Sequence, residues 1–313
     1  MTTARRLPPP RSPDRRAVLR ALAAMATVAG SPVLRAAGAG PAELRVITSA
    51  LGEATSQIVA ALTRRFPGAQ VSEDIKMLTA RGGPAVYLAV GPAALEAALN
   101  ADVTGPLVSA FVSSPAYQRL TAAAAPRRTR PVTAVFAEAA PAAQMQLIRR
   151  LYRRKVVVGV LLSASTRHLQ PLIERAAAAA DLAVSFEVVE PGASPVRALS
   201  ALTSASVLLA VPDPELYNAQ VARAVLESSY RRRQGVIGFS KAMVGAGTLA
   251  AAYTSIDDVV AQLGEMLDAL LAGQPVAEPQ YPLYWRVAIN DTVARSLDVV
   301  IDATVRGLGN FPA

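Results

Sequence analysis

Residues able to do covalent chemistry are scarce in this sequence. It contains a single histidine, His168, and no cysteine. Ser240 lies in Gly-Phe-Ser-Lys-Ala, which loosely imitates the Gly-x-Ser-x-Gly turn of serine hydrolases, but no histidine follows it to act as the base. One histidine without cysteine also provides no transition-metal cluster. We therefore expect no catalytic site, no bound metal and no cofactor.

Two further patterns have ordinary structural explanations. The letters from Gly245 to Ala250 match a dinucleotide-binding fingerprint, but they do not connect a clear strand to a clear helix, so we expect a glycine-rich turn. Asp257 and Asp258 begin an apolar helical pattern, where acids stabilise the first turn through the helix dipole. Neither pattern indicates chemistry.

Asp213 is the most constrained polar residue. It stands between Pro212 and Pro214, after the apolar segment SASVLLA and before the helical pattern AQVARAVLESSYRRR. A carboxylate at this junction can cap the helix that follows. It can also anchor a donor group of a ligand through a charge-assisted hydrogen bond. The sequence leaves both interpretations open.

Strand-like and helix-like segments alternate from residue 43 onward, which is typical of α/β proteins with parallel sheets and helices on both faces. The pattern restarts after residue 128, so we expect two α/β lobes with a ligand cleft between them. The expected boundaries are residues 40–138 for the first lobe and 139–246 for the second. Residues 247–313 are expected to supply hinge crossings and C-terminal elements that both lobes share.

Ligands of open parallel sheets bind beside the carboxyl ends of the strands. Two facing lobes would bring these ends to one cleft. The candidate ligand-binding residues are therefore those that follow the predicted strands: Ser49, Gly91, Ser113, Ser114, Ser163, Asp213, Phe239 and Ser240. For each serine taken alone, helix capping is the competing interpretation.

The N-terminal 39 residues have the three parts of an export signal. A basic start precedes a short apolar segment from Ala21 to Ala29, and small residues stand at the expected cleavage site near Ala39. Arg15 and Arg16 resemble the twin-arginine type. The alternative is a disordered basic tail. We expect cleavage of this leader and location in the periplasm.

The formal net charge of +9 does not indicate a nucleic-acid partner. Residues 1–39 hold seven arginines and one aspartate, so most of the excess lies in the leader. The arginines at 231, 232 and 233 are expected to be a solvated helix end. We expect no binding to nucleic acid.

The C-terminal half resembles the substrate-binding proteins of ABC-type transporters, and most closely the group related to tryptophan- and tyrosine-binding proteins. The resemblance covers residues 140–301 well, whereas residues 43–120 match only in pattern. The matching features are Pro212-Asp213-Pro214, Asn218, Gly238-Phe239-Ser240, Gly245-Ala246-Gly247 with Leu249 and Ala250, Leu271-Ala272-Gly273, and Asn290 with Ala294-Arg295-Ser296-Leu297.

The resemblance implies a type I periplasmic binding fold with two Rossmann-like lobes that close on a small organic ligand, amino-acid-like or aromatic. It also implies a membrane permease as partner, and we expect a monomer. In relatives that bind amino acids, hydroxyls and helix amides of the first lobe hold the carboxylate, and an acid of the second lobe holds the amino group. This sequence departs from that pattern at Gly91-Pro92-Ala93, where a hydroxyl and an amide donor are missing. A ligand sensor or accessory protein without a transport role is the alternative.

Overall fold

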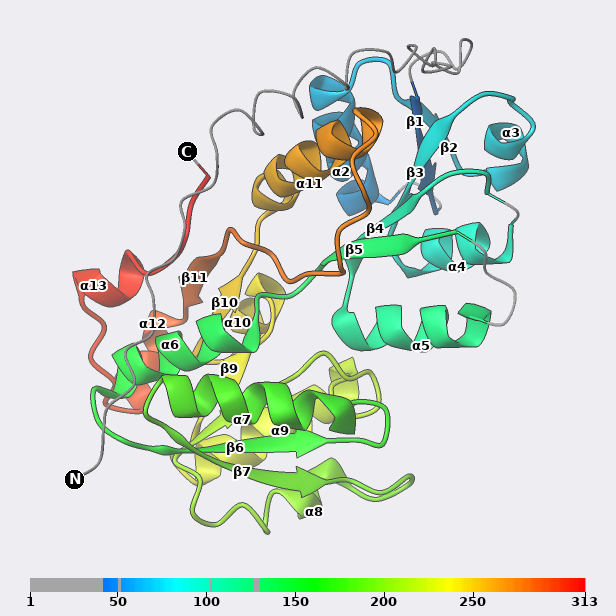
Figure 1. Cartoon of the computed structure of the whole chain (residues 1–313). Helices are drawn as coiled ribbons and strands as arrows, with labels where there is room; N and C mark the ends of the chain where they lie inside the picture. Colours follow the sequence, from blue (N-terminus) through cyan, green and yellow to red (C-terminus); the bar gives the residue numbers. More distant parts are fainter. Residues whose placement is uncertain (1–41, 50–51, 102, 126–129, 313) are drawn as a thin grey trace, which may run out of the picture. The chain divides into compact units, whose positions relative to one another are not determined.

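The computed structural model describes residues 42–49, 52–101, 103–125 and 130–312. Within them the strands form two sheets, in the orders β2-β1-β3-β4-β5 and β11-β10-β9-β8-β6-β7 (Figure 1). Every strand pairs in parallel with its neighbours except β11, which is antiparallel to β10. The predicted leader lies outside the described residues.

The first sheet is built from the N-terminal part of the chain and receives one late helix. Its strands are β1 (Glu43–Thr48), β2 (Gln70–Ser72), β3 (Ala85–Val90), β4 (Leu107–Val112) and β5 (Val132–Phe136). Its helices are α2 (Glu53–Arg65), α3 (Ile75–Thr79), α4 (Pro92–Asn100), α5 (Ser114–Ala124) and the late helix α11 (Ile256–Leu271).

The second sheet is built from the strands that follow. They are β6 (Val157–Leu162), β7 (Ala183–Val188), β8 (Val207–Leu209), β9 (Gly235–Gly238), β10 (Ala250–Tyr253) and β11 (Arg286–Ile289). The helices of this part are α6 (Pro141–Tyr152), α7 (Gln170–Ala179), α8 (Pro195–Ala198), α9 (Ala219–Arg231), α10 (Lys241–Gly245), α12 (Asp291–Ser296) and α13 (Ala303–Arg306).

The two sheets repeat one winding. The first strand of each sheet lies between the second and the third, and the fourth and fifth follow outward. The direction in which successive strands are added to the sheet therefore reverses between β1 and β3 in the first sheet and between β6 and β8 in the second. Helices that leave neighbouring strands at such a point diverge to opposite faces and leave a crevice at the strand ends. This topology puts the turn after β6 beside the turn after β8.

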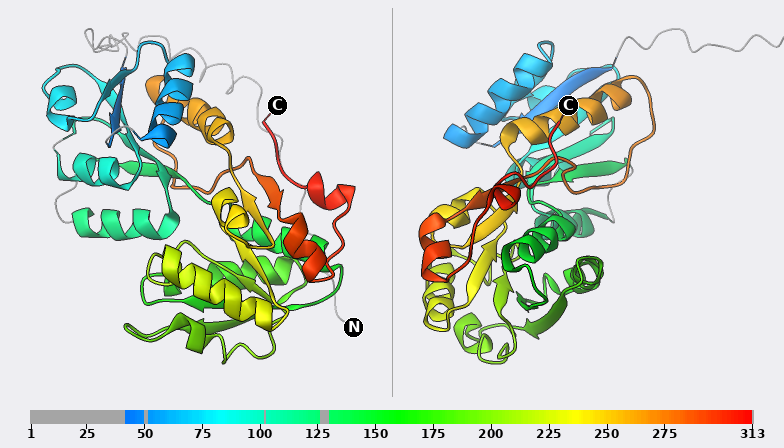
Figure 2. Two further views of the ribbon diagram at one scale, coloured as in Figure 1. Left: turned by 180° about the vertical axis from the view of Figure 1, so that it is seen from behind. Right: turned by 90° about the vertical axis from the view of Figure 1, so that its left-hand side faces the viewer.

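Alternation along β1 explains why both faces of the first sheet are covered. Leu44 and Val46 pack with the apolar side of α2 and α11, whereas Ile47 packs with the other cluster, which includes α4 and α5. The helices α2 and α11 lie side by side although almost two hundred residues separate them in the chain (Figures 1 and 2). Burial of both faces is what a parallel sheet requires.

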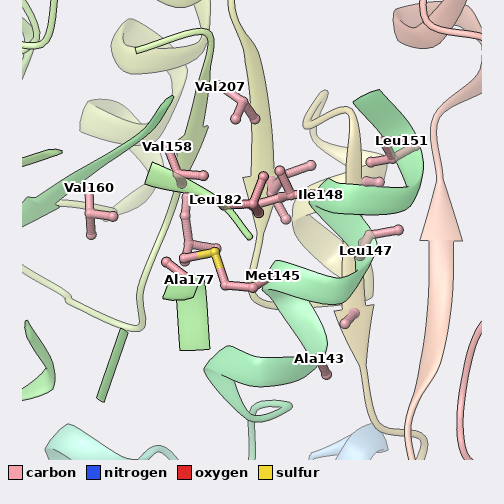
Figure 3. Packing of buried hydrophobic residues seen from close by; sticks show 14 of the residues in the cluster. Ala143, Met145, Leu147, Ile148, Leu151, Val158, Val160, Ala177, Leu182 and Val207 are labelled. Atoms are coloured by element: carbon pink, nitrogen blue, oxygen red, sulfur yellow. The ribbon is translucent and has the colours of Figure 1, made fainter. Parts of the chain in front are cut away.

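The core of the second sheet depends on α6. Met145 and Ile148 of this helix are fully buried against Val158 of β6 and Val207 of β8, as Figure 3 shows. The opposite face of the sheet packs against α9 through Val225. This packing fixes the N-terminal end of α6 near the strand ends of the second sheet.

The chain crosses between the sheets three times, and hydrogen bonds tie the crossings together. The first crossing runs from β5 to α6, the second from β10 to α11, and the third from α11 to β11. The side chain of Gln144 in α6 pairs with the backbone of Ala252 in β10, at 2.7 and 3.0 Å. On the third crossing, Gln280 pairs with the edge of β5 through Phe136 N–H, at 3.0 Å.

An ion pair links the second and third crossings. Arg286 of β11 donates two hydrogen bonds to Asp258 in the first turn of α11, at 2.7 and 2.9 Å. Burial alone would raise the pKa of Asp258, but hydrogen bonds from Arg286 and Ser255 hold it below its ordinary value. Asp258 thus lies in the first turn of a helix, as its position predicts. It also forms a capping box with Ser255 and fixes β11.

Some predicted elements differ from those observed. The helix expected over SPVRALSALTS is only one turn long, from Pro195 to Ala198, and the chain continues to Leu202 in turns that bury Leu199 and Leu202. Pro171 stands in the first turn of α7 rather than kinking a longer helix. The glycine-rich stretch after Gly245 leads from α10 into β10, so it is a turn as predicted. In the part of the chain that the structure describes, no helix combines the length and apolarity needed to cross a membrane.

Candidate ligand-binding cleft

A pocket with a volume of about 480 Å³ joins residues from both sheets, which is within the size range of small-molecule sites. The first sheet contributes the N-terminal ends of α4 and α5, and the second contributes the turns after β6, β8 and β9. The lining residues are Pro92, Ser113, Pro115, Ala116, Arg119, Ser165, Pro212, Asp213, Pro214, Glu215, Tyr217 and Phe239.

Asp213 forms the buried centre of the second wall. It is 2% exposed, and its Oδ1 accepts hydrogen bonds from the backbone N–H groups of Glu215 (2.9 Å) and Leu216 (3.3 Å). Its Oδ2 accepts a hydrogen bond from the hydroxyl of Thr166 at 2.7 Å. A carboxylate offers about four acceptor positions, so one position remains for a ligand.

Asp213 therefore holds two turns together. Thr166 Oγ1, which donates to Asp213, also accepts the N–H of Ser163 at 2.9 Å, directly after β6. The hydroxyl of Ser163 contacts the hydroxyl of Ser165 at 2.7 Å, and Ser165 lines the pocket. The rigid turn after β8 is thus fixed to the turn after β6 before any ligand binds.

The first wall leaves the N-terminal end of α4 without a side-chain cap. Among the described residues, the N-cap residues Gly91 of α4 and Ser113 of α5 make no side-chain capping hydrogen bond. However, the carboxyl of Glu138 accepts the first N–H of α5, from Ser114. Gly91 precedes α4 with a φ of 87°, a left-handed conformation that favours glycine. A β-bulge at Phe111 shifts the register of β4 just before Ser113 and α5. The N-terminal end of α4 therefore presents a partial positive charge to the pocket.

Arg119 adds a full positive charge to this wall. It is exposed and lines the pocket from the second turn of α5. In the described parts of the chain, no carboxylate forms an ion pair with it. Glu215, also exposed, stands on the second wall. The pocket therefore has a cation on one wall and two carboxyl groups on the other.

Apolar and aromatic groups separate these charges. Tyr217 and Phe239 meet edge to face, with ring centroids 6.4 Å apart, and both line the pocket. Burial, together with the charge of Asp213, raises the pKa of the Tyr217 phenol. Proline residues from both walls have no N–H group to solvate. The middle of the pocket is suited to a flat apolar body.

Glu138 is a second buried carboxyl at this end of the molecule. It follows β5, is 5% exposed, and accepts hydrogen bonds from the N–H (2.9 Å) and the hydroxyl (2.6 Å) of Ser114. The same hydroxyl lies 3.0 Å from the phenol oxygen of Tyr281 on the third crossing. Burial raises the pKa of Glu138 above its ordinary value of 4.5, and the hydrogen bonds from Ser114 offset only part of that effect.

A hollow of about 20 Å³ lies beside Glu138, Gln144 and Tyr281, and it shares Pro212 and Phe239 with the larger pocket. It has room for about one water molecule. Burial raises the pKa of Tyr281 to about 12, so this phenol remains a hydrogen-bond donor at neutral pH. The network of Glu138, Ser114 and Tyr281 joins the start of α5 to the third crossing.

Some of the predicted site residues line the pocket, and others support its walls or lie outside it. Ser113, Asp213 and Phe239 line the pocket. Ser114 and Ser163 are buried and bonded to Glu138 and to the turn of Thr166, so they support its walls. Ser240 caps α10 by accepting the N–H of Met243 at 3.3 Å. Gly91 adjoins Pro92 at the pocket, and half-buried Ser49 follows β1 without being among the lining residues.

Sequence reasoning missed Arg119, Ser165, Thr166, Glu138 and Tyr281. Arg119 could have been found by placing a helix directly after β4, because its second turn then faces the same cleft as Ser113. The pairing of Thr166 with Asp213 depends on the order of β6 and β8, which local sequence does not contain. Among the described residues, no group of three metal-ligating side chains is present.

Solved structures share this fold. An ABC domain in complex with L-Trp from Streptococcus pneumoniae aligns with a TM-score of 0.56 and 19% identity, over 85% of this chain and 97% of that chain. A conserved domain protein from Vibrio cholerae aligns with a TM-score of 0.57 and 17% identity, over the same shares. A ligand-free, open substrate-binding protein with adhesive properties from Clostridium difficile aligns with a TM-score of 0.62 and 14% identity, again over 85% and 97%.

No protein-family model and no curated protein matches the chain. The structural similarities show that the chain has the type I periplasmic binding fold of ABC-transporter substrate-binding proteins. The predicted fold class, α/β with two Rossmann-like parts, is therefore confirmed.

Proposed function

We propose that the protein is an extracytoplasmic solute-binding protein that holds a small organic molecule in the cleft pocket and presents it to a membrane permease. The shared fold supports this proposal, and so does the leader pattern in the sequence. The boundaries of the two lobes, near residues 138 and 246, belong to the same proposal. Closure of the lobes about the three crossings would be the signal that the permease detects.

One observation carries the proposal: the pocket is lined by both sheets and has opposite charges on its two walls. A ligand that contacts both walls gains affinity only when the walls approach each other, so binding favours closure. The second wall is already fixed by the hydrogen bonds of Asp213. The first wall offers Arg119 and the N-terminal end of α4, which no side chain caps within the described chain, for a negative group.

The wall chemistry indicates the ligand class. A carboxylate fits Arg119 and the N-terminal end of α4 on the first wall. A flat apolar or aromatic body fits between Tyr217, Phe239 and the prolines. A hydrogen-bond donor or an amino group fits Glu215 and the free acceptor position of Asp213. We therefore propose an aromatic or amphiphilic organic acid, including amino-acid-like molecules.

Isothermal titration of the purified chain with matched ligand pairs tests this proposal. Each pair consists of an aromatic carboxylic acid and its neutral primary amide, and a second series adds an α-amino group. We expect the acids to bind at least tenfold more tightly than the amides, with an accompanying rise in thermal midpoint. Saturable binding with no preference for the acid would contradict the assigned ligand class. No saturable binding across both series would contradict the solute-binding function.

A further inference from the structure

An arginine-lined groove lies at the end of the second sheet that is remote from the cleft. Its volume is about 590 Å³, and it is formed by the C-terminal ends of α6 and α7 together with α13. Its lining residues are Gln146, Arg149, Arg150, Arg153, Ala179, Ala180, Asp181, Thr304 and Leu308. In a parallel α/β sheet the C-terminal ends of the helices lie where the strands begin, whereas the cleft lies where they end.

The acids near this groove already have cationic partners. Asp181 is paired with Lys155 at 2.5 Å, and Asp302 is paired with Arg153 at 2.6 Å. Arg149 and Arg150 have no ion pair with any residue that the structure describes. Two guanidinium groups therefore remain available on one wall of the groove.

The positive charge extends beyond the groove. A Cβ atom added to Gly235 would stand 2.7 Å from the phenol oxygen of Tyr152, so the turn between α9 and β9 lies against the end of α6. That turn carries Arg232, which binds the carbonyl oxygen of Leu199 at 2.7 Å, and Arg233, which pairs with Asp298 at 2.5 Å. Arg232, which has no ion pair in the described chain, thus adds an unneutralised cation at this end of the sheet, whereas Asp298 balances the charge of Arg233.

The helix dipole explains only part of this arrangement. Cations in the last turn stabilise a helix by about 0.3–1 kcal/mol each when exposed. That effect does not require two unpaired guanidinium groups to line one groove beside a hydroxyl, Thr304, and an amide, Gln146. Guanidinium groups match the oxygens of phosphate in a two-pronged geometry, and several together match its multiple charge.

We propose that this groove binds a phosphate-bearing group through Arg149 and Arg150. The group belongs to either a soluble phosphate compound or a phospholipid headgroup, because both present the same oxygens. The volume is within the range of small-molecule sites. The site is separate from the cleft pocket, so its ligand does not compete with the transported solute.

The test uses the full chain with two probes, inorganic pyrophosphate by calorimetry and phosphatidylglycerol vesicles by co-sedimentation. The leader has seven arginines and would bind anions by itself, so every variant keeps it. Arg149→Ala with Arg150→Ala should weaken binding of at least one probe tenfold or more. The control, Arg64→Ala with Arg175→Ala, removes the same charge from exposed positions and should change binding less than twofold.

Arg149→Lys with Arg150→Lys keeps the charge and removes the fork geometry, so it tests recognition even if the alanine variant does not fold. We expect it to bind at least threefold more weakly than the natural chain. Groove-dependent binding of pyrophosphate identifies a soluble phosphate source, and groove-dependent binding of vesicles alone identifies a headgroup. If the lysine variant binds both probes as the natural chain does, or if the two alanine pairs behave alike, binding reflects general charge only and the proposal is overturned.

Discussion

Each wall of the cleft has one buried carboxyl at the end of a strand, and the two are held differently. Asp213, on the second wall, accepts hydrogen bonds from three residues in two turns. Glu138, which accepts the first N–H of α5, also accepts a hydrogen bond from the hydroxyl of Ser114, and burial raises its pKa. The carboxyl of Asp213 is hydrogen-bonded within one wall, whereas burial raises the pKa of the Glu138 carboxyl.

The two walls of the cleft also differ in the elements to which their hydrogen bonds connect them. The second wall is complete without ligand because its acid joins the turns after β6 and β8. On the first wall, Arg119 has no ion pair among the residues described. Glu138 is linked through the hydroxyl of Ser114 to Tyr281 on the third crossing. The second wall is therefore held by hydrogen bonds between its own turns, whereas the first wall is held through the third crossing.

The largest expected effect concerns the fixed wall. Asp213→Ala should lower the free energy of unfolding by about 3 kcal/mol, because it removes a turn cap and leaves the hydroxyl of Thr166 without its acceptor. Urea unfolding measures this loss. Glu215→Ala, an exposed change in the same turn, is the control and should stay within about 0.5 kcal/mol. Equal stability of the two variants would mean that Asp213 does not hold the wall.

The next effect concerns ligand affinity on the first wall. Arg119→Ala should weaken binding of an organic acid about tenfold, which is about 1.4 kcal/mol, and leave the unfolding free energy nearly unchanged. Gln118→Ala, the exposed neighbour on α5, should bind as the natural chain does. Titration of both variants checks this. A loss of stability in place of affinity would mean that Arg119 stabilises the fold and does not bind the ligand.

The smallest effect concerns the pH dependence of Glu138. Because its folded pKa is raised, the folded state retains the proton over a range where the unfolded state has lost it. The natural chain should therefore lose stability as the pH rises from 4.5 through the raised value. Glu138→Gln should lack this decline, so its stability relative to the natural chain should increase with pH. Urea unfolding at several pH values checks this.

Ser114→Ala sharpens the same test. It removes the hydroxyl that stabilises the charged form of Glu138, so the decline with pH should extend to higher pH than in the natural chain. Parallel pH profiles for the natural chain and Glu138→Gln would show that this carboxyl does not couple to folding, and the contrast between the two acids would disappear.

The strands of both sheets could be predicted because parallel strands buried on two faces are short apolar runs between turn residues. AVYLAV and KVVVGVLLS are observed as β3 and β6. The short helices α3, α12 and α13 could not be predicted in the same way. Each depends on one cap, such as Asp302 accepting the N–H of Val305, and on packing against a neighbour that is distant in sequence.

The candidate site was predicted in outline. The rule that ligands bind at strand ends selected Ser113, Asp213 and Phe239, which line the pocket. It also selected Ser240, which caps α10, because the rule does not say which residues of a turn face inward. The role of Glu138 could not be foreseen, since its partner Ser114 is 24 residues away and Tyr281 lies on another crossing.

The sequence by itself determined the alternating elements, their restart in a second series and the position of Asp213 at a rigid strand end, because periodicity, prolines and glycines act locally. Only the tertiary structure decided that Asp213 has three of its acceptor positions occupied and that Arg119 faces it across a pocket. It also brought the ends of α6, α7 and α13 to one groove. These outcomes depend on strand order and helix packing, which join residues that no local pattern connects.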